Sequence, residues 1–141
     1  IIADHIRAAT FILGDETGIV PSNLDQGYVL RKLIRRSIRH LALLGVNLRN
    51  VNAIVEIAEV VIDINKEDYP LLNTNKKFIF DELKKEEDKF QRTLGKGLYN
   101  IRKEMERNFP DKSDWDNREI NKPVKLSGKW VFDFFIVIVI F

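Results

Sequence analysis

Hydrophobic residues recur at helical spacing in the first part of the chain. The recurring positions are Ile2, Ile6, Ala9 and Leu13. Their intervals of four, three and four residues are those of one face of an α-helix. The turn-forming residues 14–18, GDETG, follow them directly. The pattern therefore predicts a first helix over residues 2–13.

A second helix is predicted to begin near Leu24 and to end at Gly45. Ser22 and Asp25 form the S-x-x-D capping pattern that precedes many helices, and glycine commonly stands just past a helix end. On a helical wheel, apolar residues gather on one side of this segment. They are Leu30, Leu33, Ile34, Ile38 and Leu41.

The other side of the second helix is basic. It consists of a row at intervals of four, Arg31, Arg35 and Arg39, flanked by Lys32, Arg36 and His40. The two sides are cleanly separated, which is the pattern of an amphipathic helix. We therefore expect the apolar side to face a core and the basic side to face outward.

Two further helices are predicted, over residues 51–64 and over about 75–108, with a break at Tyr69-Pro70. The inner positions of the long helix are Phe78, Ile79, Leu83, Phe90, Leu94, Leu98, Ile101 and Met105. The acidic run at residues 86–88, EED, is most simply a solvated face of that helix. The fold class predicted is all-α, a helical bundle with one long helix.

The C-terminal part has a different character. Residues 108–123 are predicted to form a polar loop, and the chain becomes strongly apolar from Lys125 onward. Periodicity does not distinguish a strand from a buried helix in the tail 134–141, FFIVIVIF, which is suited either to core packing or to association. We expect residues 1–141 to form one helical domain, excised from a larger chain.

Charge is unevenly distributed. The net charge is +2, yet residues 27–55 contain six Lys or Arg and no Asp or Glu. Such local asymmetry indicates a binding site for a polyanion. The chain has no cysteine, which excludes disulfides, thiolate zinc sites and cysteine nucleophiles. No apolar run approaches the roughly 20 residues that span a bilayer, so no membrane partner is expected.

Motifs for catalysis or metal binding are lacking. His5 and His40 are the two histidines and do not form a metal-binding pair. Residues 95–97, GKG, lack the leading glycine and the trailing Ser or Thr of a phosphate-binding loop. Asp4 beside His5 fits a catalytic pair, but a polar helix start with a partly buried histidine is favoured. We predict no catalytic residue and no metal site.

The basic side has two interpretations, an ordinary solvated surface or a phosphate-binding face. Ordinary surfaces interleave both signs of charge, so the absence of acids favours nucleic acid, held by arginine forks on phosphates. Asn23 stands just before the basic helix. Its amide suits a contact to base edges and 2′-hydroxyls in an RNA minor groove, and it suits a turn or cap equally well.

Several motifs carry a family resemblance. They are ADHIRA at 3–8, FILGD at 11–15, GIVPSN at 18–23, GYVLR at 27–31 and IRR at 34–36. Together they closely resemble alanyl-tRNA synthetase, a class II aminoacyl-tRNA synthetase, and the resemblance extends over roughly residues 1–131. It implies a helical segment that follows the aminoacylation domain and docks the acceptor stem of tRNA-Ala, which a G·U wobble pair marks.

The resemblance also implies roles for individual residues. Asn23 matches the family's asparagine after Pro-Ser, a minor-groove contact to the wobble pair. The residues expected to bind tRNA are Asn23, Arg31, Lys32, Arg35, Arg36 and Arg39. One departure concerns the tail, where Gly128, Val131 and Phe132 fit a family signal but the family's second wobble-pair residue, an aspartate, falls on Ile136.

The expected partners are tRNA-Ala and the rest of a cytoplasmic synthetase chain. This segment would carry no cofactor and would not be catalytic alone, while the parent enzyme would use ATP with Mg²⁺ and hold Zn²⁺ in its editing domain. A different class of function stays open beside this one, a helical protein-interaction or dimerisation module that binds no RNA.

Overall fold

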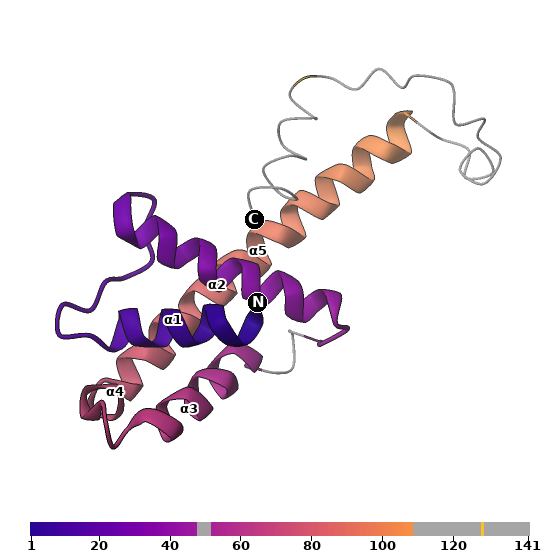
Figure 1. Ribbon diagram of the computed structural model, residues 1–141. Helices are drawn as coiled ribbons and strands as arrows, with labels where there is room; N and C mark the ends of the chain where they lie inside the picture. Colours follow the sequence, from indigo (N-terminus) through magenta and orange to yellow (C-terminus); the bar gives the residue numbers. More distant parts are fainter. Residues whose placement is uncertain (48–51, 109–127, 129–141) are drawn as a thin grey trace. The chain divides into compact units, whose positions relative to one another are not determined.

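A computed structural model describes residues 1–47, 52–108 and 128, and the regular structure in these residues is helical. The helices are α1 (Ile2–Gly14), α2 (Asp25–Leu43), α3 (Ala53–Asn65), α4 (Pro70–Thr74) and α5 (Lys76–Asn108) (Figure 1). The all-α prediction is confirmed, including the single long helix. The polar loop expected after residue 108, the tail 134–141 and Ile136 lie outside the described residues.

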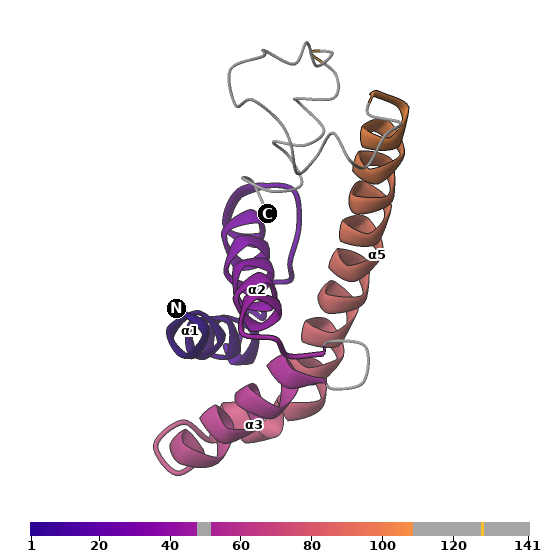
Figure 2. The ribbon, with the colours of Figure 1, turned by 90° about the vertical axis from the view of Figure 1, so that its right-hand side faces the viewer.

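The chain divides into two compact units, residues 1–90 and 91–141. In the first unit, α1 packs against α2, α3 and α4, and α3 also packs against α2 and α4. Figure 2 shows α3 crossing the first turns of α5, where Lys76 Nζ lies 2.7 Å from Glu59 Oε1. The candidate site lies within this first unit.

The apolar stripes of the helices form the core of the first unit. Its buried hydrophobic residues are Ile6, Ala9, Leu13, Leu30, Ile34, Ile38, Leu41, Ala53, Ile54, Ala58, Ile62, Leu72, Ile79, Leu83 and Phe90. The predicted stripes of α1 and α2 are largely confirmed, with Ile2 and Leu33 half-buried. Phe78 was expected inside, but it is 39% exposed because it lies off the Ile79–Leu83 stripe.

A short helix follows the predicted break at Pro70. This helix, α4, begins with Pro at its first turn, where the missing N–H is not needed. Its five residues are too few to show a periodic pattern, which is why the sequence did not predict it. It packs closely on α1, since a Cβ on Gly14 would lie 2.5 Å from Leu72 Cδ2.

The C-terminus of α2 is closed as its glycine predicts. Gly45 has φ +81°, a left-handed conformation that glycine adopts without steric cost. Gly45 N donates to Ala42 O at 3.0 Å and Val46 N donates to Leu41 O at 3.1 Å. These are the two hydrogen bonds of the Schellman motif, so the predicted end of the helix is confirmed.

Candidate nucleic-acid interface

The bend before α2 is packed onto the first turn of that helix. Ser22 N donates to Gly27 O at 3.0 Å. A Cβ on Gly27 would lie 2.3 Å from Ser22 Oγ and 2.6 Å from Val20 O, distances that no side chain tolerates. Gly27 is therefore required because the bend lies directly against it, and this contact fixes where Asn23 stands.

The capping pattern predicted for Ser22 and Asp25 is wrong. The N-cap position of α2 is occupied by Leu24, and it has no side-chain capping hydrogen bond. Ser22 Oγ instead accepts from Leu24 N at 3.2 Å and donates to Leu24 O at 2.9 Å, a local turn that competes with capping. Asp25 has φ +47°, which places its backbone outside the geometry of a capping box.

Asn23 is exposed at this bend. Its side-chain oxygen Oδ1 accepts a hydrogen bond from Arg31 Nη1. Within the described residues its amide nitrogen Nδ2 has no hydrogen-bond partner. Because the oxygen is engaged, Asn23 presents a donor to an incoming ligand, and it acts neither as a helix cap nor through a turn of its own.

The prediction that the row Arg31, Arg35 and Arg39 faces outward is wrong for its first two members. Arg35 is 7% exposed, and its Nε donates to Glu86 Oε1 of α5 at 2.6 Å. Its guanidinium also lies 5.5 Å from the ring centroid of Phe90. Arg31 Nε lies 3.3 Å from the same Glu86 oxygen. These two arginines border the apolar stripe, and α5 covers that border.

The acidic run of α5 is not a solvated face. Glu86 is 2% exposed and Glu87 is 3% exposed, whereas Asp88 is exposed. Sequence reasoning missed Glu86, although its spacing held a signal. Glu86 follows Leu83 by three residues and precedes Phe90 by four, so it occupies the buried stripe. A carboxylate at such a position needs a cation, and the basic side of α2 supplies two.

Three basic residues of α2 do face solvent, namely Lys32, Arg36 and Arg39, at intervals of four and three. We call them the basic stripe. Within the described part of the chain, none of the three forms an ion pair, and Lys32 Nζ lies 5.6 Å from the ring centroid of Tyr28. A stripe without carboxylates is suited to bind phosphates.

The basic stripe also influences a histidine of α1. Burial lowers the pKa of His5 below its usual 6.5, and the positive charge of Arg36 lowers it further. The protonated form of His5 is therefore disfavoured in the folded chain. Asp4 acts in the opposite direction and does not outweigh these two causes, so the catalytic pairing of Asp4 with His5 gains no support.

Comparison with known proteins decides the family. Residues 1–120 match the family of class II tRNA synthetases (A). The chain belongs to the alanyl-tRNA synthetase family. The resemblance carried by the ADHIRA, GIVPSN and GYVLR motifs is thereby confirmed at the level of the family, while the tRNA-binding roles of individual residues stay predictions.

Relatives from several bacteria share the match. The alanine–tRNA ligase of Borreliella afzelii is 48% identical over 97 residues, 69% of this chain and 16% of that protein. Alanine–tRNA ligase 1 of Lachnoclostridium phytofermentans is 44% identical over 106 residues, covering 75% and 11%. The Treponema pallidum enzyme is 44% identical over 120 residues, covering 85% and 19%. The chain thus spans less than a fifth of each relative's length.

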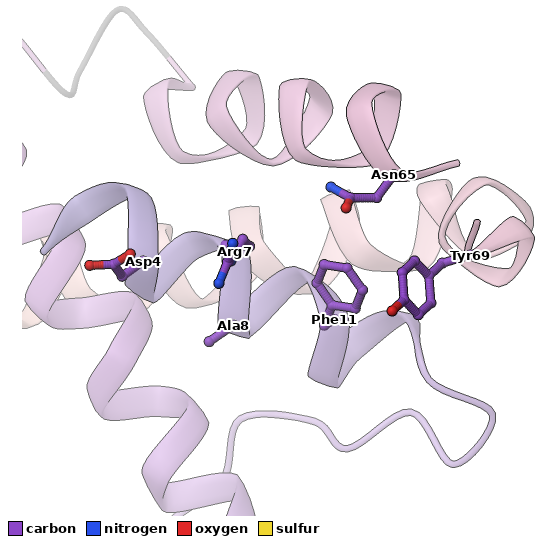
Figure 3. A pocket seen from close by; sticks show the side chains of 6 residues that line it. All are labelled: Asp4, Arg7, Ala8, Phe11, Asn65 and Tyr69. Carbon is purple, nitrogen blue, oxygen red and sulfur yellow. The ribbon is translucent and has the colours of Figure 1, made fainter. Parts of the chain in front are cut away.

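The described residues of this synthetase segment also form a pocket away from the predicted tRNA-binding residues. Figure 3 shows a pocket between α1 and the end of α3, lined by Asp4, Arg7, Ala8, Phe11, Asn65 and Tyr69. The rings of Phe11 and Tyr69 meet edge to face, with centroids 5.1 Å apart. Asn65 Nδ2 donates to Val61 O at 2.7 Å. The polar groups of this pocket do not converge on one point, and none of the residues predicted to bind tRNA lines it.

The described residues contain no group of three or more His, Asp or Glu side chains placed to hold a metal ion. Among the described helices, none combines the length and the apolar character needed to cross a bilayer.

Proposed function

We propose that this chain recognises the acceptor stem of tRNA-Ala. Asn23 contacts the minor groove at the G·U wobble pair, and the basic stripe holds the flanking phosphates. The observation that carries the proposal is the placement of Asn23 at an exposed bend that leads into α2, the helix whose exposed basic residues Lys32, Arg36 and Arg39 have no carboxylate partners in the described residues. Phosphate contacts set the register, and the amide reads the base pair.

The orientation of Asn23 defines what it reads. Its oxygen accepts from Arg31, so its amide donates hydrogen bonds to the RNA. The minor groove of A-form RNA is wide and shallow and offers base acceptors and 2′-hydroxyls. A donor at the bend therefore seeks an acceptor on the floor of the groove. Replacing the wobble pair with G·C shifts this acceptor, so the Asn23 amide fits a G·C stem less well.

Arg31 and Arg35 have a different role in this proposal. Both were expected to bind phosphates, yet both pair with Glu86. Arg35 is buried and stabilises the packing of α2 on α5, and Arg31 connects Glu86 to Asn23. The phosphate-binding set is therefore reduced to Lys32, Arg36 and Arg39.

In the parent synthetase, this recognition supports ATP-dependent attachment of alanine to tRNA-Ala. ATP with Mg²⁺ and the zinc of the editing domain belong to other parts of such an enzyme, which we place in the cytoplasm. The contribution of this segment is to present the acceptor stem in one register, a positioning effect that raises the rate of a reaction between two bound partners.

The decisive experiment is a titration of the 141-residue chain with two RNA hairpins. One carries the tRNA-Ala acceptor stem with its G·U pair and the other carries G·C at that position. We expect the wild type to prefer the G·U hairpin and Asn23→Ala to reduce that preference by about 1–3 kcal/mol, the scale of one bidentate base contact. Gln26→Ala, at another exposed residue near the start of α2, is the matched control and should keep the preference.

The dimerisation alternative rests on a separate observation. Val60 is 56% exposed and Ile64 is 74% exposed, one turn apart on α3, an apolar pair suited to helix association. Salt separates the two functions, because hydrophobic association persists at high salt whereas phosphate binding weakens steeply. If the chain self-associates and binds neither hairpin at low salt, the tRNA proposal is wrong.

A further inference from the structure

The buried carboxylate of Glu86 is connected to the exposed bend through one arginine. Glu86 Oε1 lies 2.6 Å from Arg35 Nε and 3.3 Å from Arg31 Nε. Arg31 in turn donates from Nη1 to Asn23 Oδ1. The guanidinium of Arg31 thus meets Glu86 at one edge and Asn23 at the other.

From this arrangement we infer that Glu86 is a positioning residue for acceptor-stem recognition, acting on Asn23 through Arg31. The inference rests on the proposed function, and it adds the residue that orients Asn23 for reading the base pair. Glu86 lies on the buried stripe of α5, an element separate from the bend. Arg31 contacts both Glu86 and Asn23, and it holds the Asn23 amide with its donor facing outward.

The charge of Glu86 is what keeps Arg31 in place. An arginine side chain is long and flexible, and a nearby phosphate competes for it. The side chain of Arg31 is 15% exposed, so it stands at the boundary between α5 and solvent. Without the carboxylate, Arg31 is free to turn toward the RNA backbone, and Asn23 loses the partner that orients its amide.

Loss of Glu86 therefore has a signature that ordinary damage to the fold does not produce. A released Arg31 adds one phosphate contact, so affinity for any RNA hairpin rises at low salt and the log–log salt slope becomes steeper by about 0.7 to 0.9. At the same time the preference for G·U over G·C falls, because the amide is no longer oriented. A partly unfolded chain would lose affinity and preference together.

The test uses Glu86→Gln, which keeps the size of the side chain and an acceptor oxygen but removes the charge. A double variant, Arg35→Met with Glu86→Gln, removes the buried cation as well, so that Arg35 is not left as an unpaired buried charge. The matched control is Glu82→Gln on the same helix, because Glu82 pairs with Lys85 of α5 at 2.8 Å and not with α2.

Two measurements decide the inference. The first is binding of both hairpins at roughly 50 and 200 mM salt. The second, made without RNA, is the NMR signal of the Asn23 side-chain amide in ¹⁵N-labelled protein. We expect both Glu86 variants to lower the G·U preference by the same factor as Asn23→Ala, about fivefold or more, and to move the amide signal. Glu82→Gln should behave as wild type.

The possible outcomes distinguish the positioning role of Glu86 from the proposed function, recognition of the acceptor stem by Asn23. If Asn23→Ala loses the preference while both Glu86 variants keep it with an unchanged amide signal, the positioning role is overturned and the proposed function stands. If Asn23→Ala itself keeps the wild-type preference, acceptor-stem reading by Asn23 is overturned, and the role of Glu86 in it is overturned as well.

Discussion

Arg35 and Arg39 lie one turn apart on α2 but occupy opposite environments. Arg35 is 7% exposed and bonded to Glu86, whereas Arg39 is exposed. Removing Arg35 leaves a buried carboxylate without its closest cation, which typically costs about 3–5 kcal/mol. We therefore expect Arg35→Ala to lower the free energy of unfolding by about that amount, measured by urea denaturation. Arg39→Ala should change it by no more than about 0.5 kcal/mol.

In an RNA-binding assay, we expect the change at Arg39 to matter and the change at Arg35 not to matter, the opposite of their order in stability. Arg39→Ala should weaken binding to both hairpins by a similar factor, because a phosphate contact carries no sequence information. Arg35→Met with Glu86→Gln, in which neither buried charge is left unpaired, tests whether Arg35 itself touches RNA. A salt slope that is shallower in the double variant than in Glu86→Gln alone would contradict the assignment of Arg35 to the interior.

At the scale of residues, the sequence predicted the buried apolar side of α2 but not the burial of its charged neighbours. The wheel correctly identified the buried stripe of α2, because apolar periodicity reports the direction of the core. The wheel wrongly placed Arg31 and Arg35 on the solvent side, because it describes one helix and does not show how much of that helix a neighbouring helix covers. The spacing of Glu86 between Leu83 and Phe90 contained the missing information, but it becomes decisive when α5 is known to lie against α2.

At the scale of elements, three glycines give a graded test of why glycine is needed. At Gly27 a Cβ meets the bend at 2.3 Å, at Gly45 the backbone has φ +81° with nothing within 4 Å, and at Gly95 a Cβ has open space in a helix. Alanine should therefore destabilise most at Gly27, by about 1–3 kcal/mol through overpacking. It should cost about 1–2 kcal/mol at Gly45 and stabilise by up to about 1 kcal/mol at Gly95.

Thermal unfolding of the three variants checks this order. Gly27→Ala also displaces the bend that carries Asn23, so its preference for the G·U hairpin should fall, whereas Gly45→Ala and Gly95→Ala should keep it. A Gly27→Ala protein as stable as Gly95→Ala would show that the bend does not lie against α2 in solution.

The elements themselves were predictable to different degrees. Long periodic helices and the glycine end of α2 were predicted correctly, because each leaves several signals in the sequence. The start of α2 was also predicted within one residue, but its capping was not, since Ser22 and Asp25 match a pattern that the backbone at Asp25, with φ +47°, does not adopt. The helix α4 was missed because one turn contains too few positions to show a period.

At the scale of the whole molecule, the distribution of charge determines how binding depends on salt. Sequence alone counts six Lys or Arg in residues 27–55, but two of them are paired with Glu86. If the basic stripe makes the phosphate contacts, the log–log slope of affinity against salt should be about −2 to −3, near 0.7 to 0.9 for each contact. Alanine at each stripe residue should remove one such increment, and alanine at all three should nearly abolish the slope. A slope near −4 would mean that the two paired arginines also bind phosphate.

The stability of the folded chain should also depend on pH through His5. Burial is the largest cause of its lowered pKa. The positive charges of Arg36, the terminal ammonium and His40 lower the pKa further, and the negative charge of Asp4 raises it. A histidine whose pKa is lower in the folded than in the unfolded chain binds protons more readily when unfolded. Its contribution to stability is therefore complete above the unfolded pKa of 6.5 and decreases as the pH falls below that value.

The comparison of wild type with His5→Gln isolates this effect from every other titrating group. The stability advantage of the wild type over His5→Gln, measured by urea denaturation, should be larger at pH 7.5 than at pH 5.5. An advantage that stays constant, or that grows at the lower pH, would mean that His5 is protonated at no extra cost in the folded chain. Neither burial nor the positive charge of Arg36 would then disfavour the protonated imidazole.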